Sequence, residues 1–132
     1  MDTKKIAYIV VTAVFCIGIL PGAVLDIAQP DFVAETMAGI QLPLYVLTLI
    51  GIWKLLGIVA LAAPQFRRVN EWAYAGFFFD LTGAMWVHLA GGDPLSSAVP
   101  AGVLMVPLFA SYWLRDARQM PATSTLGRAA TA

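Results

Sequence analysis

Three long apolar segments constrain this chain more than any other feature: residues 6–25, 44–63 and 72–91. A helix of about 20 residues rises about 30 Å, which matches the hydrocarbon core of a bilayer. A fourth segment, residues 98–114, is shorter and contains two prolines. Because every backbone polar group must be paired within lipid, segments of this pattern are expected to be helical. The pattern predicts an all-α integral membrane protein, a bundle of four transmembrane helices.

The composition excludes a soluble globular domain. Hydrophobic residues make up 60% of the chain and charged residues 12%, with a mean hydropathy of +0.78. Soluble chains are typically about 45–50% apolar and about 25% charged. The formal net charge is zero, so no basic excess indicates nucleic acid. The single cysteine, Cys16, excludes an internal disulfide, and with one histidine no metal site is expected.

The positions of the basic residues predict the topology. The loops at residues 26–43 and 92–97 contain no Lys or Arg, but contain four acidic residues. Seven of the eight basic residues fall outside the bundle on the opposite side: Lys4, Lys5, Arg67, Arg68, Arg115, Arg118 and Arg128. Loops rich in Lys and Arg stay in the cytoplasm. We therefore expect a multi-pass protein of the inner membrane with both termini in the cytoplasm.

The chain is predicted to form one domain, residues 1–116, followed by a C-terminal tail. Residues 117–132 are rich in Ala, Thr and Ser and are expected to be disordered. In the first outer loop, residues 31–38 can form a short helix that ends at Gly39. That helix would lie on the membrane surface as a connector, or cover the bundle as a lid.

Three ionisable residues inside the apolar segments, Lys54, Asp80 and His88, are the candidate catalytic residues. A charge at membrane depth costs several kcal/mol, so it normally faces inward and has a partner. Counted from the cytoplasmic side, Lys54 and Asp80 lie at nearly the same depth, which predicts an ion pair between them. His88 lies nearer the outer side, within reach of Asp26.

A helical projection of residues 72–91 groups the small residues around Asp80, and bulky side chains such as Tyr74 lie on the far side. Small residues often mark the face where membrane helices meet, so this face is expected to pack inward. The room beside Asp80 predicts a pocket between the helices. Its expected ligand-binding residues are Trp53, Trp86 and Asp26, next to the three ionisable residues. Its expected ligand is amphipathic, either quinone-like or lipid-like.

Two blocks of the sequence carry a resemblance to a known family. Residues 51–57 read Gly-Ile-Trp-Lys-Leu-Leu-Gly, and residues 71–84 read Glu-Trp-Ala-Tyr-Ala-Gly-Phe-Phe-Phe-Asp-Leu-Thr-Gly-Ala, followed by His88. Together with Leu-Pro-Leu-Tyr at residues 42–45, they resemble the DoxX-like family. The resemblance implies a four-helix membrane protein. It also implies relatives that are linked to membrane oxidoreductase complexes. One such relative is a small subunit of a thiosulfate:quinone oxidoreductase.

Three functional classes fit the resemblance and the polar residues. The first is a small membrane subunit or accessory factor of a quinone-linked redox system, with Lys54, Asp80 and His88 at the polar site. The second is a stand-alone membrane enzyme or transporter for a small lipophilic substrate, with Asp80 as acid and base. The third is an assembly factor or chaperone for membrane proteins. Lipid, a membrane redox complex and a second copy of the chain are the expected partners, and no intrinsic cofactor is expected.

The topology is tested by labelling single cysteines placed at residues 31 and 68 with an impermeant thiol reagent in intact cells. We expect the cysteine at residue 31 to react, because its loop has no basic residue and lies outside. Labelling at residue 68 in place of residue 31 would show that the orientation is inverted.

Overall fold

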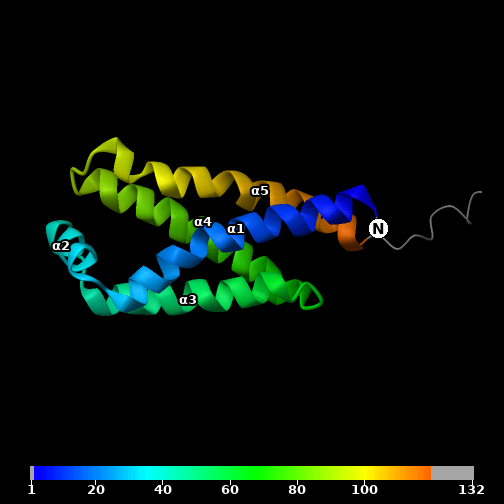
Figure 1. Ribbon diagram of the computed structural model, residues 1–132, viewed down its shortest axis with the longest axis horizontal. Coiled ribbons are helices and arrows are strands. Elements are labelled where there is room, and N and C mark those ends of the chain that lie inside the picture. The colour runs from blue at the N-terminus through cyan, green and yellow to red at the C-terminus, as the bar shows by residue number, and fades with distance from the viewer. Residues whose placement is uncertain (1, 120–132) are drawn as a thin grey trace, which may run out of the picture.

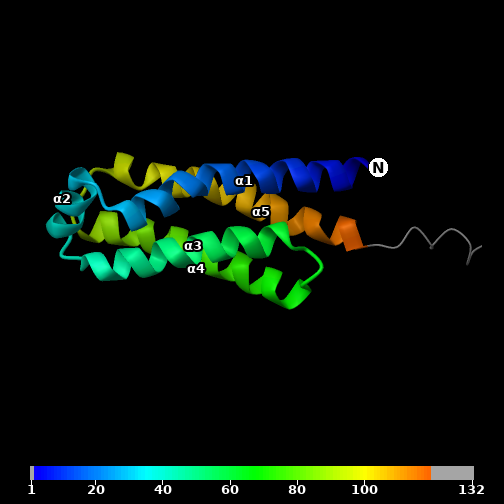
Figure 2. The same ribbon diagram turned by 60° about the horizontal axis from the view of Figure 1, so that its bottom comes forward.

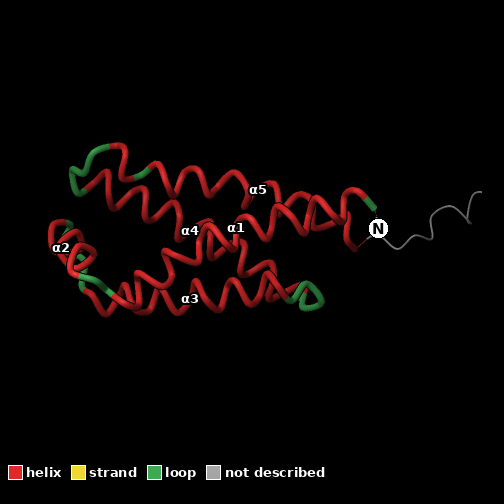
Figure 3. Tube along the Cα trace, in the orientation of Figure 1, coloured by secondary structure: helices red, strands yellow, loops and turns green. Residues whose placement is uncertain are grey.

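The computed structural model describes residues 2–119, and the side chains of residues 2–116. This part of the chain consists of helices joined by short loops and contains no strand (Figure 3). Its elements are α1 (Thr3–Ala28), α2 (Asp31–Gly39), α3 (Leu44–Ala62), α4 (Arg67–Ala90), a short 3₁₀ turn (Leu95–Ser97) and α5 (Val99–Gln119).

The four long helices lie along the long axis of the molecule, and each packs mainly against two others (Figures 1 and 2). α1 packs against α3 and α5, and α4 packs against the same two helices from the other side. The start of α1, the α3–α4 connection and the end of α5 share one end of the molecule. α2 and the α4–α5 connection share the other end (Figure 1). The segments that carry the basic residues therefore lie together.

Three of the described segments are long and apolar enough to cross a membrane by length and composition: Thr3–Ala28, Leu44–Ala62 and Leu95–Asp116. α4 is of similar length, but it begins with Arg67 and Arg68 and carries Asp80 near its middle. Large apolar side chains cover the outside of the molecule; Trp72, for example, is 78% exposed. An apolar exterior of this extent is typical of a protein surrounded by lipid.

The core is built from bulky side chains of all four long helices. Phe15 of α1 is fully buried and meets Phe77 of α4 edge to face, with ring centroids 4.9 Å apart. The other buried members of this cluster are Ile19, Leu61, Tyr74, Leu81 and Leu108. Cys16 packs against the cluster as a partly buried apolar side chain.

The expectation that small residues form the inner face of α4 is wrong. Tyr74 and Phe77 are buried, whereas Gly76 and Gly83 are exposed, with open space where a Cβ atom would be. The close approach between α3 and α4 depends instead on Gly57 of α3. A Cβ atom there would lie 2.6 Å from the ring of Phe77. Gly76 and Gly83 thus lie on an open surface and not at a helix contact, whereas Ala73 packs against the core.

Gly51 sets the distance between α3 and α1. A Cβ atom at this position would lie 2.9 Å from Cβ of Asp26 and 3.0 Å from the carbonyl oxygen of Ala23. Both distances are shorter than ordinary van der Waals contacts, so only glycine fits without a shift of the backbone. Gly51 therefore brings the end of α1 close to the middle of α3.

Several helices extend beyond their predicted bounds. α1 reaches residue 28 and not 25, and α4 begins at Arg67 and not at Trp72. α5 continues to Gln119, so residues 117–119, predicted as part of a disordered tail, are helical. The rest of that predicted tail, residues 120–132, lies outside the described residues. The short helix expected at residue 31 is present as α2.

Two glycine substitutions are expected to change the stability in opposite directions. Gly51→Ala should lower the free energy of unfolding in detergent by about 1–3 kcal/mol, because α1 must move away. Gly83→Ala should raise it by about 0.5–1 kcal/mol, because alanine favours the helix and meets no neighbour. Equal effects of the two substitutions would show that Gly51 is not a packing contact.

Candidate functional site

Lys54 of α3 lies between two carboxylates that come from two other helices. Its Nζ atom is 2.7 Å from Oδ2 of Asp26, at the end of α1, and 3.6 Å from Oδ2 of Asp80, in the middle of α4. All three side chains are largely buried, with exposed fractions of 14%, 13% and 18% in that order. The predicted ion pair between Lys54 and Asp80 is present, but Asp26 is the closer partner. We call these three residues the charged cluster.

Glycines and one glutamine allow the charged cluster to form. Gly51 lets Asp26 approach α3 one turn before Lys54. On α1, a Cβ atom at Gly22 would lie 4.0 Å from Nζ of Lys54, so the ammonium group rests beside bare backbone. After Asp26, Gln29 adopts a left-handed conformation with φ 48° and ends α1. Its Nε2 atom donates to the carbonyl oxygen of Leu44, 2.7 Å away, and so ties the end of α1 to α3.

The charged cluster carries more acid than base. With all groups ionised, two carboxylates face one ammonium, which leaves one negative charge in apolar surroundings. Such a charge is unfavourable unless a proton or another partner neutralises it. Lys54 donates a hydrogen bond to Asp26, whereas Oδ2 of Asp80 is buried and has no hydrogen-bond partner among residues 2–116. Asp80 is therefore the carboxylate that is able to take a proton or bind a ligand.

A groove of about 380 Å³ runs between α3 and α4 and ends on the charged cluster. Trp53 and Trp72 line it and are largely exposed, and Gly76 leaves it open along α4. Lys54 and Asp80 are the only ionisable side chains among the described residues that line it; the remaining lining residues are Ile50, Leu56, Gly57, Ala60, Val69, Ala73 and Phe77. The groove thus combines an apolar body with one polar contact point.

His88 and Trp86 do not line this groove. His88 was expected within reach of Asp26, but the partner found for it among the described residues is Asp93, whose Oδ2 atom lies 2.7 Å from Nδ1 of His88. The turn after α4 passes through Gly92, whose φ is 82°, and returns Asp93 to the histidine. Trp86 is 73% exposed on the outer surface of α4. Of the two tryptophans predicted to bind the ligand, Trp53 lines the groove and Trp86 does not.

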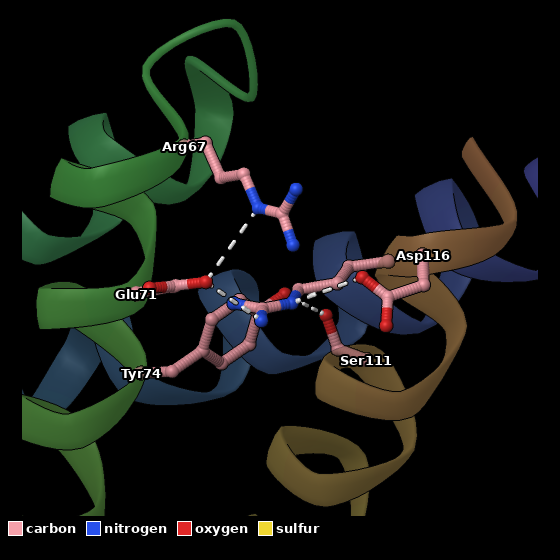
Figure 4. Close-up of polar contacts among 6 residues, drawn as sticks. Arg67, Glu71, Tyr74, Ser111 and Asp116 are labelled. Atoms are coloured by element: carbon pink, nitrogen blue, oxygen red, sulfur yellow. Dashed lines mark hydrogen bonds and ion pairs between the residues drawn. The ribbon is translucent and has the colours of Figure 1, made fainter. Parts of the chain in front are cut away.

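A second polar region joins α4 and α5 (Figure 4). Arg115 of α5 is buried, and its Nη2 atom donates to Oε1 of Glu71 at 3.0 Å. Arg67 approaches the same carboxylate atom at 3.6 Å, and Nε of Arg115 lies 3.6 Å from Oδ1 of Asp116. The buried position of Arg115 and its contact with Glu71 were not predicted, because a basic residue at a helix end normally remains in water.

Next to Arg115, buried hydroxyl groups form a chain across three helices. Oγ of Ser111 lies 2.6 Å from the hydroxyl of Tyr74 and 2.6 Å from Oγ1 of Thr12, which donates to the carbonyl oxygen of Tyr8. Each hydroxyl has one proton, so Ser111 donates to Thr12, and Tyr74 donates to Ser111. The chain therefore links α4, α5 and α1, and nothing in the spacing of these residues indicated it.

No group of three or more His, Cys, Asp or Glu residues is placed to hold a metal ion in the described part of the chain. The chemistry open to the charged cluster itself is hydrogen bonding and proton exchange, with Lys54 as a donor and Asp80 as an acid or base.

Single substitutions in the charged cluster should differ in their effect on the free energy of unfolding in detergent. Lys54→Met leaves two buried carboxylates without a cation and should cost about 3–5 kcal/mol. Asp26→Asn should cost more than Asp80→Asn, because Lys54 keeps its 2.7 Å hydrogen bond in the second variant. Similar losses for the two aspartate variants would mean that Lys54 binds both carboxylates equally.

Comparison with known proteins identifies the family. The model of the DoxX-like family matches residues 10–111, which is more than half of the chain. The matched stretch includes the whole charged cluster and both sides of the α3/α4 groove, whereas Arg115 lies beyond it. Comparisons with curated proteins and with solved structures gave no match. The family match confirms the resemblance seen in the sequence, and the chain belongs to the DoxX-like family of membrane proteins.

Proposed function

We propose that this protein is a four-helix inner-membrane protein that binds an amphipathic, quinone-like ligand in the α3/α4 groove. The observation that carries the proposal is an apolar groove that ends on the ion pair of Lys54 and Asp80. A quinone has the matching form, with an apolar tail and a ring whose carbonyl oxygens accept hydrogen bonds. The protein serves as a small subunit or accessory factor of a quinone-linked redox system.

All four long helices are proposed to cross the bilayer, with both termini in the cytoplasm. The charge that distinguishes α4 from the other three is compensated: Asp80 faces Lys54, and the outward surface of α4 carries apolar rings such as Phe79 and Trp86. The basic residues gather at one end of the molecule, which supports a cytoplasmic position for that end. A groove between α3 and α4 then opens sideways to lipid, and a quinone can enter it from the bilayer.

The proposed roles follow from the chemistry of the two side chains. The Lys54 ammonium group donates a hydrogen bond to a ring carbonyl. The Asp80 carboxyl group exchanges a proton with the ring oxygen, and Asp26 keeps Lys54 in place through its shorter contact. Reduction of a quinone to a quinol consumes two electrons and two protons. A partner oxidoreductase supplies the electrons, and this chain supplies the binding site and the proton-exchanging carboxyl.

A second candidate function is a membrane enzyme or transporter that uses Asp80 as an acid and base. The excess carboxylate of the charged cluster favours it, because a site with two acids and one base has a proton to bind and release. This candidate uses the same groove but takes a different lipophilic substrate.

Ligand binding can be measured through Trp53 and Trp72, because a quinone in the groove should quench their fluorescence. In a Trp86→Phe/Trp113→Phe background, where these are the only tryptophans, a short-chain ubiquinone analogue should quench in a saturable way. Asp80→Asn should raise the dissociation constant about tenfold, which corresponds to about 1.4 kcal/mol and to the loss of one charged hydrogen bond.

Two neighbouring substitutions in α4 provide the control. A Cβ atom at Gly76 has open space around it, so a larger side chain can be accommodated there. Gly76→Leu should therefore place its side chain in the α3/α4 groove and abolish saturable quenching. Ala75→Leu faces a different groove, between α4 and α5, and should leave the dissociation constant unchanged. Equal quenching in both variants would overturn the proposed site. Saturable binding of other lipophilic compounds in place of the quinone would favour the enzyme or transporter.

A further inference from the structure

We propose that the groove between α4 and α5 binds an anionic phospholipid, with the phosphate at Arg115 and an acyl chain along the aromatic wall. This site is separate from the α3/α4 groove and does not depend on the function proposed for it. The lipid belongs to the leaflet at the end of the molecule where the basic residues gather.

The groove has the shape and lining that an acyl chain requires. Its volume is about 340 Å³, and its wall is formed mainly by the rings of Tyr74, Phe78, Phe79 and Tyr112. Glu71 is its one charged lining residue in the described chain. From Glu71 the groove follows α4 toward Phe79, that is, from the helix end toward the middle of the molecule. It is therefore polar at the membrane surface and apolar at depth, as a phospholipid is.

Arg115 forms the charged end of this groove, because it contacts three of the residues that line it. Its guanidinium carbon lies 4.3 Å from the ring centroid of Tyr112 and 5.9 Å from that of Tyr74, and Nη2 bonds Glu71. The Arg115 side chain is only 8% exposed. Even so, its Nε and Nη1 atoms have no hydrogen-bond acceptor among residues 2–116. A buried guanidinium with unused donors is a site that favours an oxyanion.

The contacts around Arg115 favour an anion. The guanidinium groups of Arg67 and Arg115 share the single carboxylate of Glu71, and the Arg67 side chain is 64% exposed at the rim. Asp116, the other acid in contact with Arg115, is 71% exposed. Glu71 is itself 44% exposed and bonded on both sides by arginines. Rotation of Glu71 toward Arg67 uncovers Arg115, and the phosphate then takes the place of the carboxylate. Basic residues at the cytoplasmic ends of membrane helices commonly bind anionic headgroups in this way.

A phospholipid is favoured over free phosphate because of the rings below the guanidinium. Free phosphate would use only the arginines at the rim, whereas a lipid also covers the exposed apolar groove between Phe78 and Tyr112. Ala75 lines the groove two turns below Arg67 and forms no ion pair. A larger side chain at this position should therefore weaken binding of a phospholipid but not of free phosphate.

The experiment is native mass spectrometry of the full chain, which is released from detergent after incubation with phosphatidylglycerol or phosphatidylcholine. The measured quantity is the amount of each lipid that remains bound. Phosphatidylglycerol should remain bound at least fivefold more than phosphatidylcholine of the same acyl chains. Arg115→Gln should remove this preference. Loss of Arg115 can also disturb folding, so the exposed Arg67 provides a second charge variant. In Arg67→Gln, the preference for phosphatidylglycerol over phosphatidylcholine should fall about two- to threefold.

The groove itself is tested by the pair Ala75→Leu and Gly76→Leu, which lie side by side on α4 but face different grooves. Ala75→Leu should lower retention of phosphatidylglycerol at least fivefold, and Gly76→Leu should not. Equal retention of the two lipids by the wild type would overturn the proposal. So would retention unchanged by Ala75→Leu, or displacement of the lipid by millimolar inorganic phosphate, which would identify a simple anion site.

Discussion

The position of one ammonium group organises the middle of this protein. Lys54 lies among helices whose other side chains are almost all apolar, and its charge is tolerated because carboxylates from α1 and α4 reach it. The requirement extends to residues that carry no charge. Gly51 must be small for Asp26 to come close, and Gln29 must end α1 so that the chain can return into α3. The two ion pairs of Lys54 therefore fix the relative positions of α1, α3 and α4.

The sequence predicted the charged site in part. Counting residues from the helix ends placed Lys54 and Asp80 at one depth, because the rise per residue of a helix is fixed. The same counting ended the first helix at residue 25. Asp26 was therefore placed in a loop, and His88 was expected to be its neighbour. Helix ends depend on local contacts such as those of Gln29, and these do not follow from hydropathy.

The helical projection of α4 failed for a different physical reason. A projection identifies which residues share a face, but not whether the face meets a helix or lipid. Here Phe77 fills the space that Gly57 leaves on α3, so the bulky face of α4 turns inward and Gly76 turns outward. Gly76, which was expected to mark tight packing, instead leaves the groove beside α3 open. The contact of Arg115 with Glu71 could not be predicted either, because it joins residues 44 positions apart.

The hydroxyl chain beside Arg115 ends on a backbone carbonyl, that of Tyr8. A carbonyl oxygen within a helix accepts a hydrogen bond but has no proton to donate, so the chain ends on an acceptor at this point. Ser111 is the middle member of the chain and contacts both other hydroxyl groups. Loss of this one hydroxyl would break both contacts at once, so the link between α1, α4 and α5 at this end depends on a single small side chain.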